Sequence, residues 1–160
     1  MDNIVKNFKN IRSSINNSNV NIIAVSKTFQ LDKIKPLIDF GHNHFGENKV
    51  QEAKDKWINI RQNYPKLQLH MIGKLQTNKA KDAVKLFDYI HSIDNEKLAN
   101  TVAKYENLLG KKNKYFIQVN IGNEGQKSGI RTDQLSDFYF FSKKNSINVI
   151  GLMCIPPNDK

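Results

Sequence analysis

Short apolar runs and amphipathic stretches alternate along the whole chain, and this alternation is the feature that most constrains the fold. The runs that suit β-strands cover residues 21–26, 44–46, 67–72, 89–93, 115–121 and 147–155. The stretches with apolar residues at helical spacing cover residues 1–15, 31–40, 49–63, 77–86, 95–109 and 132–144. Because strands that alternate with helices are joined by right-handed crossovers, the pattern predicts an α/β fold with a parallel sheet.

Six such units are compatible with an open doubly wound sheet or with part of a (β/α)8 barrel. No glycine-rich phosphate loop follows the first predicted strand, which argues against a dinucleotide-binding sheet. In either architecture, ligands collect at the carboxyl ends of the strands. The polar residues at those ends are therefore the candidates for function.

The first predicted strand ends in a lysine. Four apolar residues, Ile22-Ile23-Ala24-Val25, suit a strand buried on both faces, and Ser26-Lys27 follow directly. A lysine at a strand end can be partly removed from water, which favours the neutral amine that forms a Schiff base. The alternative, a solvated lysine at the exit of a strand, stays open on this evidence alone.

The charge of the chain does not indicate a nucleic-acid-binding protein. The formal net charge is +10, but only three of the 25 basic residues are arginine, namely Arg12, Arg61 and Arg131. The lysines are spread over every predicted helix, without an arginine cluster or interleaved aromatic residues that could read bases. We therefore expect no specific nucleic-acid partner.

The cysteine content and the hydropathy favour a cytoplasmic protein. Cys154 is the single cysteine, so no disulfide can form within the chain, which fits a reducing compartment. The N-terminal stretch lacks the apolar core of a secretion signal, and no apolar run approaches the ~20 residues that span a bilayer. We expect no contact with a membrane.

Histidines offer a weaker hypothesis. His42 and His44 lie two residues apart, with Glu47 close by, which superficially suggests a metal site. No third ligand is obviously placed to complete the histidine pair. His70 and His91 each lie inside an apolar strand, where a hydrogen-bonded interior histidine is the simpler interpretation. We predict no metal site and assign no role to Cys154.

Taken together, the strand ends form an ordered set of motifs that resembles a known family. The motifs are Ala24-Val25-Ser26-Lys27, Phe45-Gly46-Glu47-Asn48 with Gln51-Glu52, the run from His70 to Lys79 (HMIGKLQTNK), His91-Ser92-Ile93-Asp94, Gln118-Val119-Asn120-Ile121 with Glu124 and Lys127-Ser128-Gly129, and Gly151-Leu152-Met153. In this order, over nearly the whole chain, they resemble the pyridoxal 5′-phosphate homeostasis protein family, whose fold is like the N-terminal barrel of alanine racemase.

The resemblance implies a (β/α)8 TIM-type barrel that binds pyridoxal 5′-phosphate (PLP) in its mouth as a Schiff base on Lys27. Asn48, Ile72 and Met153 are the implied cofactor neighbours, and Lys127 matches a second lysine of the family. It implies a carrier or regulator in vitamin B6 homeostasis without established turnover, whose partners would be PLP and PLP-dependent apo-enzymes. We expect a monomer. A racemase-like enzyme is the alternative, although that chemistry needs two opposed acid/base groups, usually supplied in part by a second domain.

The chain departs from the family pattern at its C-terminal end. Residues 1–160 would form a single, incomplete PLP-binding domain with about six of eight β/α units. Nothing in them matches the Ser- and Gly-rich segments with which the family holds the phosphate. We therefore expect this chain to bind PLP weakly, because an open arc of strands exposes both edges and the interior to water.

Overall fold

The computed structural model describes residues 3–122 and 128–156 of the 160. Its strands are β1 (Ala24–Val25), β2 (His44–Glu47), β3 (Gln68–Met71), β4 (Tyr89–Ile93), β5 (Lys114–Asn120), β6 (Ile130–Arg131) and β7 (Val149–Cys154). They form one seven-stranded sheet in which β1 to β6 follow in sequence order and β7 pairs with β5. Every pairing is parallel, as the alternation predicted.

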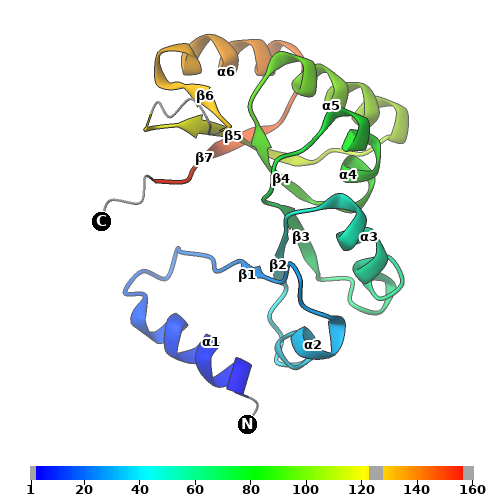
Figure 1. Cartoon of the computed structure of the whole chain (residues 1–160), viewed down its shortest axis with the longest axis vertical. Helices are drawn as coiled ribbons and strands as arrows, with labels where there is room; N and C mark the ends of the chain where they lie inside the picture. The colour runs from blue at the N-terminus through cyan, green and yellow to red at the C-terminus, as the bar shows by residue number, and fades with distance from the viewer. Residues whose placement is uncertain (1–2, 123–127, 157–160) are drawn as a thin grey trace.

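Helices occupy the connections between the strands. They are α1 (Asn3–Ser14), α2 (Leu31–Asp39), α3 (Val50–Trp57), α4 (Ala80–Leu86), α5 (Glu96–Leu109) and α6 (Leu135–Lys144), with short 3₁₀ turns η1 (Arg61–Asn63), η2 (Thr77–Lys79) and η3 (Thr132–Gln134). Helices α2 to α6 follow the outer side of the curved sheet, and α1 lies at its β1 end (Figure 1). The arrangement confirms the predicted α/β fold class with a parallel sheet. No helix in the described ranges combines the length and hydrophobicity needed to cross a membrane.

The sheet buries one face against the helices. Phe45, Leu69, Ile90 and Tyr115 project from four neighbouring strands into this layer and are fully buried, together with Trp57 of α3. Parallel register keeps partners on the same face of the sheet. The layer between the sheet and the helices is therefore the hydrophobic core of the chain.

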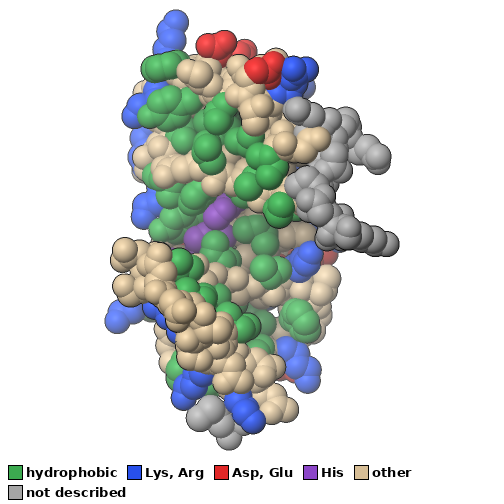
Figure 2. Space-filling model, turned by 90° about the vertical axis from the view of Figure 1, so that its left-hand side faces the viewer, with side chains coloured by type: hydrophobic (Ala, Val, Ile, Leu, Met, Phe, Trp, Pro, Cys, Tyr) green, Lys and Arg blue, Asp and Glu red, His purple; other side chains and the backbone are tan. Residues whose placement is uncertain are grey.

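The inner face of the arc carries a different set of side chains. Register places Gly46 beside His70, and His70 beside Tyr89, on this face. Figure 2, which views the molecule from the side away from most helices, shows hydrophobic side chains along this face with histidines near its middle. Among the described strands no pairing joins β1 to β7, so the arc stays open.

Several element boundaries differ from the sequence prediction, and one strand was not predicted. The first strand contains only Ala24–Val25 because it lies at the edge of the sheet and pairs only with the short β2. The helix predicted over 49–63 ends at Trp57 and is followed by η1. Strand β6 was not predicted, because two residues after a polar stretch give no periodic signal. Gly129, directly before β6, has a φ of 127° and packs closely on β5. A Cβ added to it would lie 2.7 Å from the Asn120 nitrogen.

Candidate functional site

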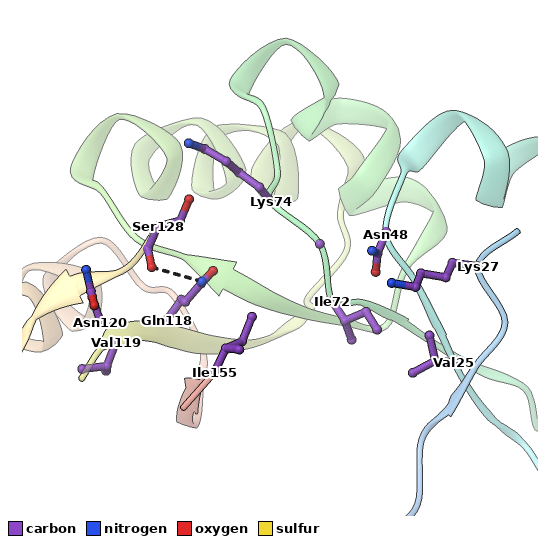
Figure 3. Close-up of a pocket in the computed structure, with 11 residues that line it drawn as sticks. Val25, Lys27, Asn48, Ile72, Lys74, Gln118, Val119, Asn120, Ser128 and Ile155 are labelled. Carbon is purple, nitrogen blue, oxygen red and sulfur yellow. Dashed lines mark hydrogen bonds between the residues drawn. The ribbon is translucent and has the colours of Figure 1, made fainter. Parts of the chain in front are cut away.

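A cavity of about 450 Å³ lies at the carboxyl ends of the strands, and we call it the strand-end cavity (Figure 3). Its volume is within the range of about 300–1,000 Å³ typical of ligand pockets. One wall follows β1, β2 and β3, and the other comes from the end of β5 and from later segments. Its lining residues are Val25, Lys27, Asn48, Ile72, Gly73, Lys74, Gln118, Val119, Asn120, Ser128 and Ile155.

Lys27 reaches this cavity from a tight turn after β1. The amide N–H of Phe29 donates to the carbonyl oxygen of Ser26 at 3.2 Å, and Thr28 between them has a φ of 65°. A β-branched residue rarely adopts positive φ, so this turn is strained by about 1–3 kcal/mol. Figure 3 shows the Lys27 amine directed toward the side chain of Asn48. The Lys27 side chain is exposed, as in the solvated alternative that the sequence left open.

Asn48 and Ile72 form the wall beside Lys27. Each follows directly on its strand, and the Ile72 amide N–H donates to the carbonyl oxygen of Glu47 at 2.9 Å. The two segments approach closely, since a Cβ added to Gly73 would lie 2.3 Å from the Asn48 carbonyl oxygen. Glycine at position 73 is therefore what allows Asn48 and Ile72 to share one wall.

Met153 and Lys127, the other two predicted site residues, are not among the described residues that line the cavity. Met153 is paired with Gln118 and lies on the same face of the sheet, but only Ile155, two residues further, lines the cavity. Lys127 falls outside the described residues. The proposed cofactor contact of each remains a prediction.

The far wall contains polar residues that the sequence analysis placed in motifs but did not assign to the site. The Gln118 side-chain amide donates to the Ser128 carbonyl oxygen at 3.2 Å, and Asn120 follows on the same strand. In Figure 3, the side chain of Lys74 extends toward Ser128. Their position at the ends of parallel strands was the signal that could have identified them.

A buried polar network lies behind Lys27, on the helix side of the sheet. Glu47 is completely buried, and its Oε1 accepts hydrogen bonds from Ser26 Oγ at 2.8 Å, Lys56 Nζ at 2.9 Å and Trp57 Nε1 at 2.9 Å. Lys56 Nζ also donates to the Ser26 carbonyl oxygen at 2.7 Å. Glu47 therefore ties the end of β2 to the end of β1 and to α3.

Histidines form a second network on the inner face, and we call His44, His70 and His91 the histidine row. His44 Nδ1 lies 3.0 Å from His70 Nε2, and His70 Nδ1 lies 2.9 Å from His91 Nε2. The His70 ring stacks on Tyr89, and the His91 ring stacks on Phe116. Because a neutral imidazole has one donor and one acceptor nitrogen, His70 donates to one neighbour and accepts from the other.

The environment of the row keeps these imidazoles neutral. Burial, reinforced by His91 and His44, lowers the pKa of His70 to about 3, and burial lowers the pKa of His91 to about 4. Glu47 projects away from the row into its own network. No group of three potential metal ligands converges within the described residues.

The chemistry available in the strand-end cavity is that of amines and amides. Lys27 and Lys74 supply primary amines, and Asn48, Gln118 and Asn120 supply side-chain amides. None of the described residues lining it is a carboxylate, a histidine or a tyrosine. The lining suits capture of an anionic carbonyl compound better than paired acid/base catalysis.

The chain resembles known proteins over most or all of its length. The family model described as alanine racemase, N-terminal domain, matches residues 1–160. A pyridoxal phosphate homeostasis protein of Vibrio cholerae is 38% identical over 88% of this chain, and one of Buchnera aphidicola is 37% identical over 100% of it. The chain spans 61% of the Vibrio relative and 74% of the Buchnera relative.

Solved structures show the same similarity. PipY of Synechococcus elongatus without PLP superposes with a TM-score of 0.89 and 35% identity, covering 98% of this chain and 73% of that chain. PipY with PLP bound superposes with a TM-score of 0.87 and 34% identity, covering 98% and 72%.

Proposed function

The chain belongs to the alanine racemase N-terminal domain family and, within it, to the pyridoxal phosphate homeostasis proteins, and from this we propose that it binds PLP in the strand-end cavity. The observation that carries the proposal is Lys27, whose amine enters this cavity beside Asn48. The Vibrio and Buchnera relatives are named pyridoxal phosphate homeostasis proteins, and the structure of PipY has been solved with PLP bound. When bound, the cofactor supplies an aldehyde carbon that a lysine nitrogen can join as a Schiff base, with release of water.

The residues present fit such a group. Lys27 supplies the nucleophilic amine, and Asn48 and Ile72 form the polar and apolar parts of the wall beside it. The amides of Gln118 and Asn120 can donate to oxygen atoms, and the amine of Lys74 adds a positive charge that attracts an anion. Met153 and Lys127 complete the proposed site, Met153 from the same face as Gln118.

We propose a carrier or regulator of PLP and not a catalyst. Racemisation needs acid/base groups on opposite sides of the substrate carbon, whereas the described lining residues offer only lysines as titratable groups. The proposal includes one domain over residues 1–160, because β1 to β7 share one sheet. It also includes a monomeric, cytoplasmic protein that exchanges PLP with PLP-dependent apo-enzymes.

The test uses PLP and the chain itself. Borohydride reduction during a PLP titration near neutral pH traps the captured cofactor, and peptide mapping identifies the lysine that holds it. We expect weak but saturable capture at Lys27, loss of capture in Lys27→Ala, and no change in Lys144→Ala, which alters an exposed lysine in the last turn of α6, before the amino end of β7 and not at the carboxyl ends of the strands. Modification spread over many lysines without preference for Lys27 would contradict the proposal. Deuterium exchange at the α-carbon of an added amino acid would instead support the racemase alternative.

A further inference from the structure

The turn that carries Lys27 is held by the ion pair of Lys56 and Glu47, and neither residue lines the strand-end cavity. The Ser26 carbonyl oxygen closes the turn by accepting from the Phe29 amide, and the same oxygen accepts from Lys56 Nζ at 2.7 Å. Lys56 comes from α3, on the helix side of the sheet, and its side chain is only 10% exposed. The peptide unit that precedes Lys27 is thus fixed from behind by an ammonium group.

Glu47 fixes that ammonium group and the neighbouring wall of the cavity at the same time. It pairs with Lys56 at 2.9 Å, accepts from the Ser26 hydroxyl, and its main-chain carbonyl accepts from the Ile72 amide. The next residue along the chain is Asn48. The three cavity positions Lys27, Asn48 and Ile72 are therefore each bonded to, or directly follow, a residue of this network.

The hydrogen bonding of the Glu47 carboxylate is unevenly distributed over its two oxygens, which selection for stability alone would not favour. All three side-chain donors converge on Oε1, while Oε2 is buried and has no hydrogen-bond partner among the described residues. A buried ion pair often stabilises a fold no better than apolar residues of the same size. What this pair does provide is geometry, because its donors and acceptors reach β1, β2 and α3 together.

We propose that Glu47 and Lys56 are positioning residues that hold the Ser26–Lys27 peptide so that the Lys27 amine enters the strand-end cavity. This inference rests on the proposed function, in which Lys27 is the amine that takes PLP. Lys56→Met removes the donor to Ser26. Glu47→Gln keeps an acceptor oxygen for all three donors but removes the charge.

The experiment measures PLP capture and the integrity of the turn separately. Capture is the rate at which PLP becomes trapped on Lys27 by borohydride, and turn integrity is the hydrogen-exchange rate of the Phe29 amide. In Lys56→Met we expect capture to slow by about tenfold or more, since a small misplacement of a reacting group has large effects. Phe29 exchange should accelerate by a similar factor, and Glu47→Gln should show smaller changes of both kinds.

Two comparisons separate positioning from stability. Asp88→Asn weakens the half-buried Arg61–Asp88 pair at the other end of the strands, and we expect it to lower the urea midpoint without slowing capture by more than about twofold. The double variant Glu47→Gln, Lys56→Met leaves no unpaired buried charge, so its urea midpoint should recover toward that of the wild type. Its capture should stay slow, because Ser26 still lacks its donor.

Each outcome decides one of the two claims. Capture that recovers with stability in the double variant, or that is unchanged in Lys56→Met, would overturn the positioning role. Equal trapping in the wild type and in Lys27→Ala would overturn the proposed function instead. In that case the Phe29 exchange rates still decide whether Lys56 holds the turn.

Discussion

Acidification should destabilise this protein well before its carboxylates titrate, because of the histidine row. Burial lowers the pKa of His70 to about 3 and that of His91 to about 4, from an ordinary value of 6.5. The unfolded chain therefore binds protons at these positions between the two values while the folded chain does not. The stabilising contribution of the two neutral histidines is complete above about pH 6.5 and decreases as the pH falls below that value. The decrease levels off near the pKa values of the folded state.

The size of this effect follows from the two pKa values. Between about pH 7 and pH 5, each unfolded histidine becomes almost fully protonated and each folded one stays neutral, which costs about 2 kcal/mol per residue. The two histidines together give about 4 kcal/mol, a large part of the 5–15 kcal/mol typical of a domain of this kind. The pKa values of His42 and His44 are also lowered by burial, so they act in the same direction.

Urea unfolding at a series of pH values, without PLP, measures the effect directly. The matched variant is His91→Phe, which keeps a ring against Phe116 but removes one titrating group. At pH 7 it should lose about 1 kcal/mol because His70 loses a hydrogen-bond partner. Its further loss between pH 7 and 5 should be about 2 kcal/mol smaller than that of the wild type, which is the contribution of His91. A wild-type free energy of unfolding that is equal at both pH values, or an equal pH dependence in the variant, would refute the reasoning.

Other substitutions test the cavity wall and the core. Gly73→Ala places a Cβ against the Asn48 backbone and should reduce stability by about 1–3 kcal/mol and weaken PLP capture. Gly110→Ala, at φ 60° with open space around it, should reduce stability by about 1 kcal/mol and leave capture unchanged, so equal capture in both glycine variants would contradict the wall assignment. Tyr115→Phe removes the hydroxyl that donates to the buried Glu106 at 3.1 Å, and urea unfolding should show a loss of about 1.5–3 kcal/mol. A loss below the error of the measurement would show that this hydrogen bond contributes nothing net.

The parallel α/β fold was predictable because it depends on local pattern. Apolar runs such as Tyr89–Ile93 fix where strands form, and the amphipathic stretches between them leave only crossover connections. Short elements escaped this reasoning, since the two residues of β6 contain no period and are defined by pairing with β5. The length of β1 was likewise set by its partner, not by its own apolar run.

The cavity residues divide in the same way. The strand-end rule and the family motifs identified Lys27, Asn48 and Ile72, and all three line one cavity. Gln118 and Lys74 were present in the motifs but had no assigned role, because only folding brings the end of β5 opposite the ends of β1 to β3.

The sequence by itself determined the order of strands and helices and the lysine at the end of the first strand, because these follow from residue type and spacing. Only the tertiary structure decided what surrounds that lysine. Glu47 is separated from Ser26 by 21 residues and His70 from His91 by 21, so neither network could be read from spacing. Both arise because parallel register places residues of neighbouring strands side by side, on the helix side for Glu47 and on the inner side for the histidines.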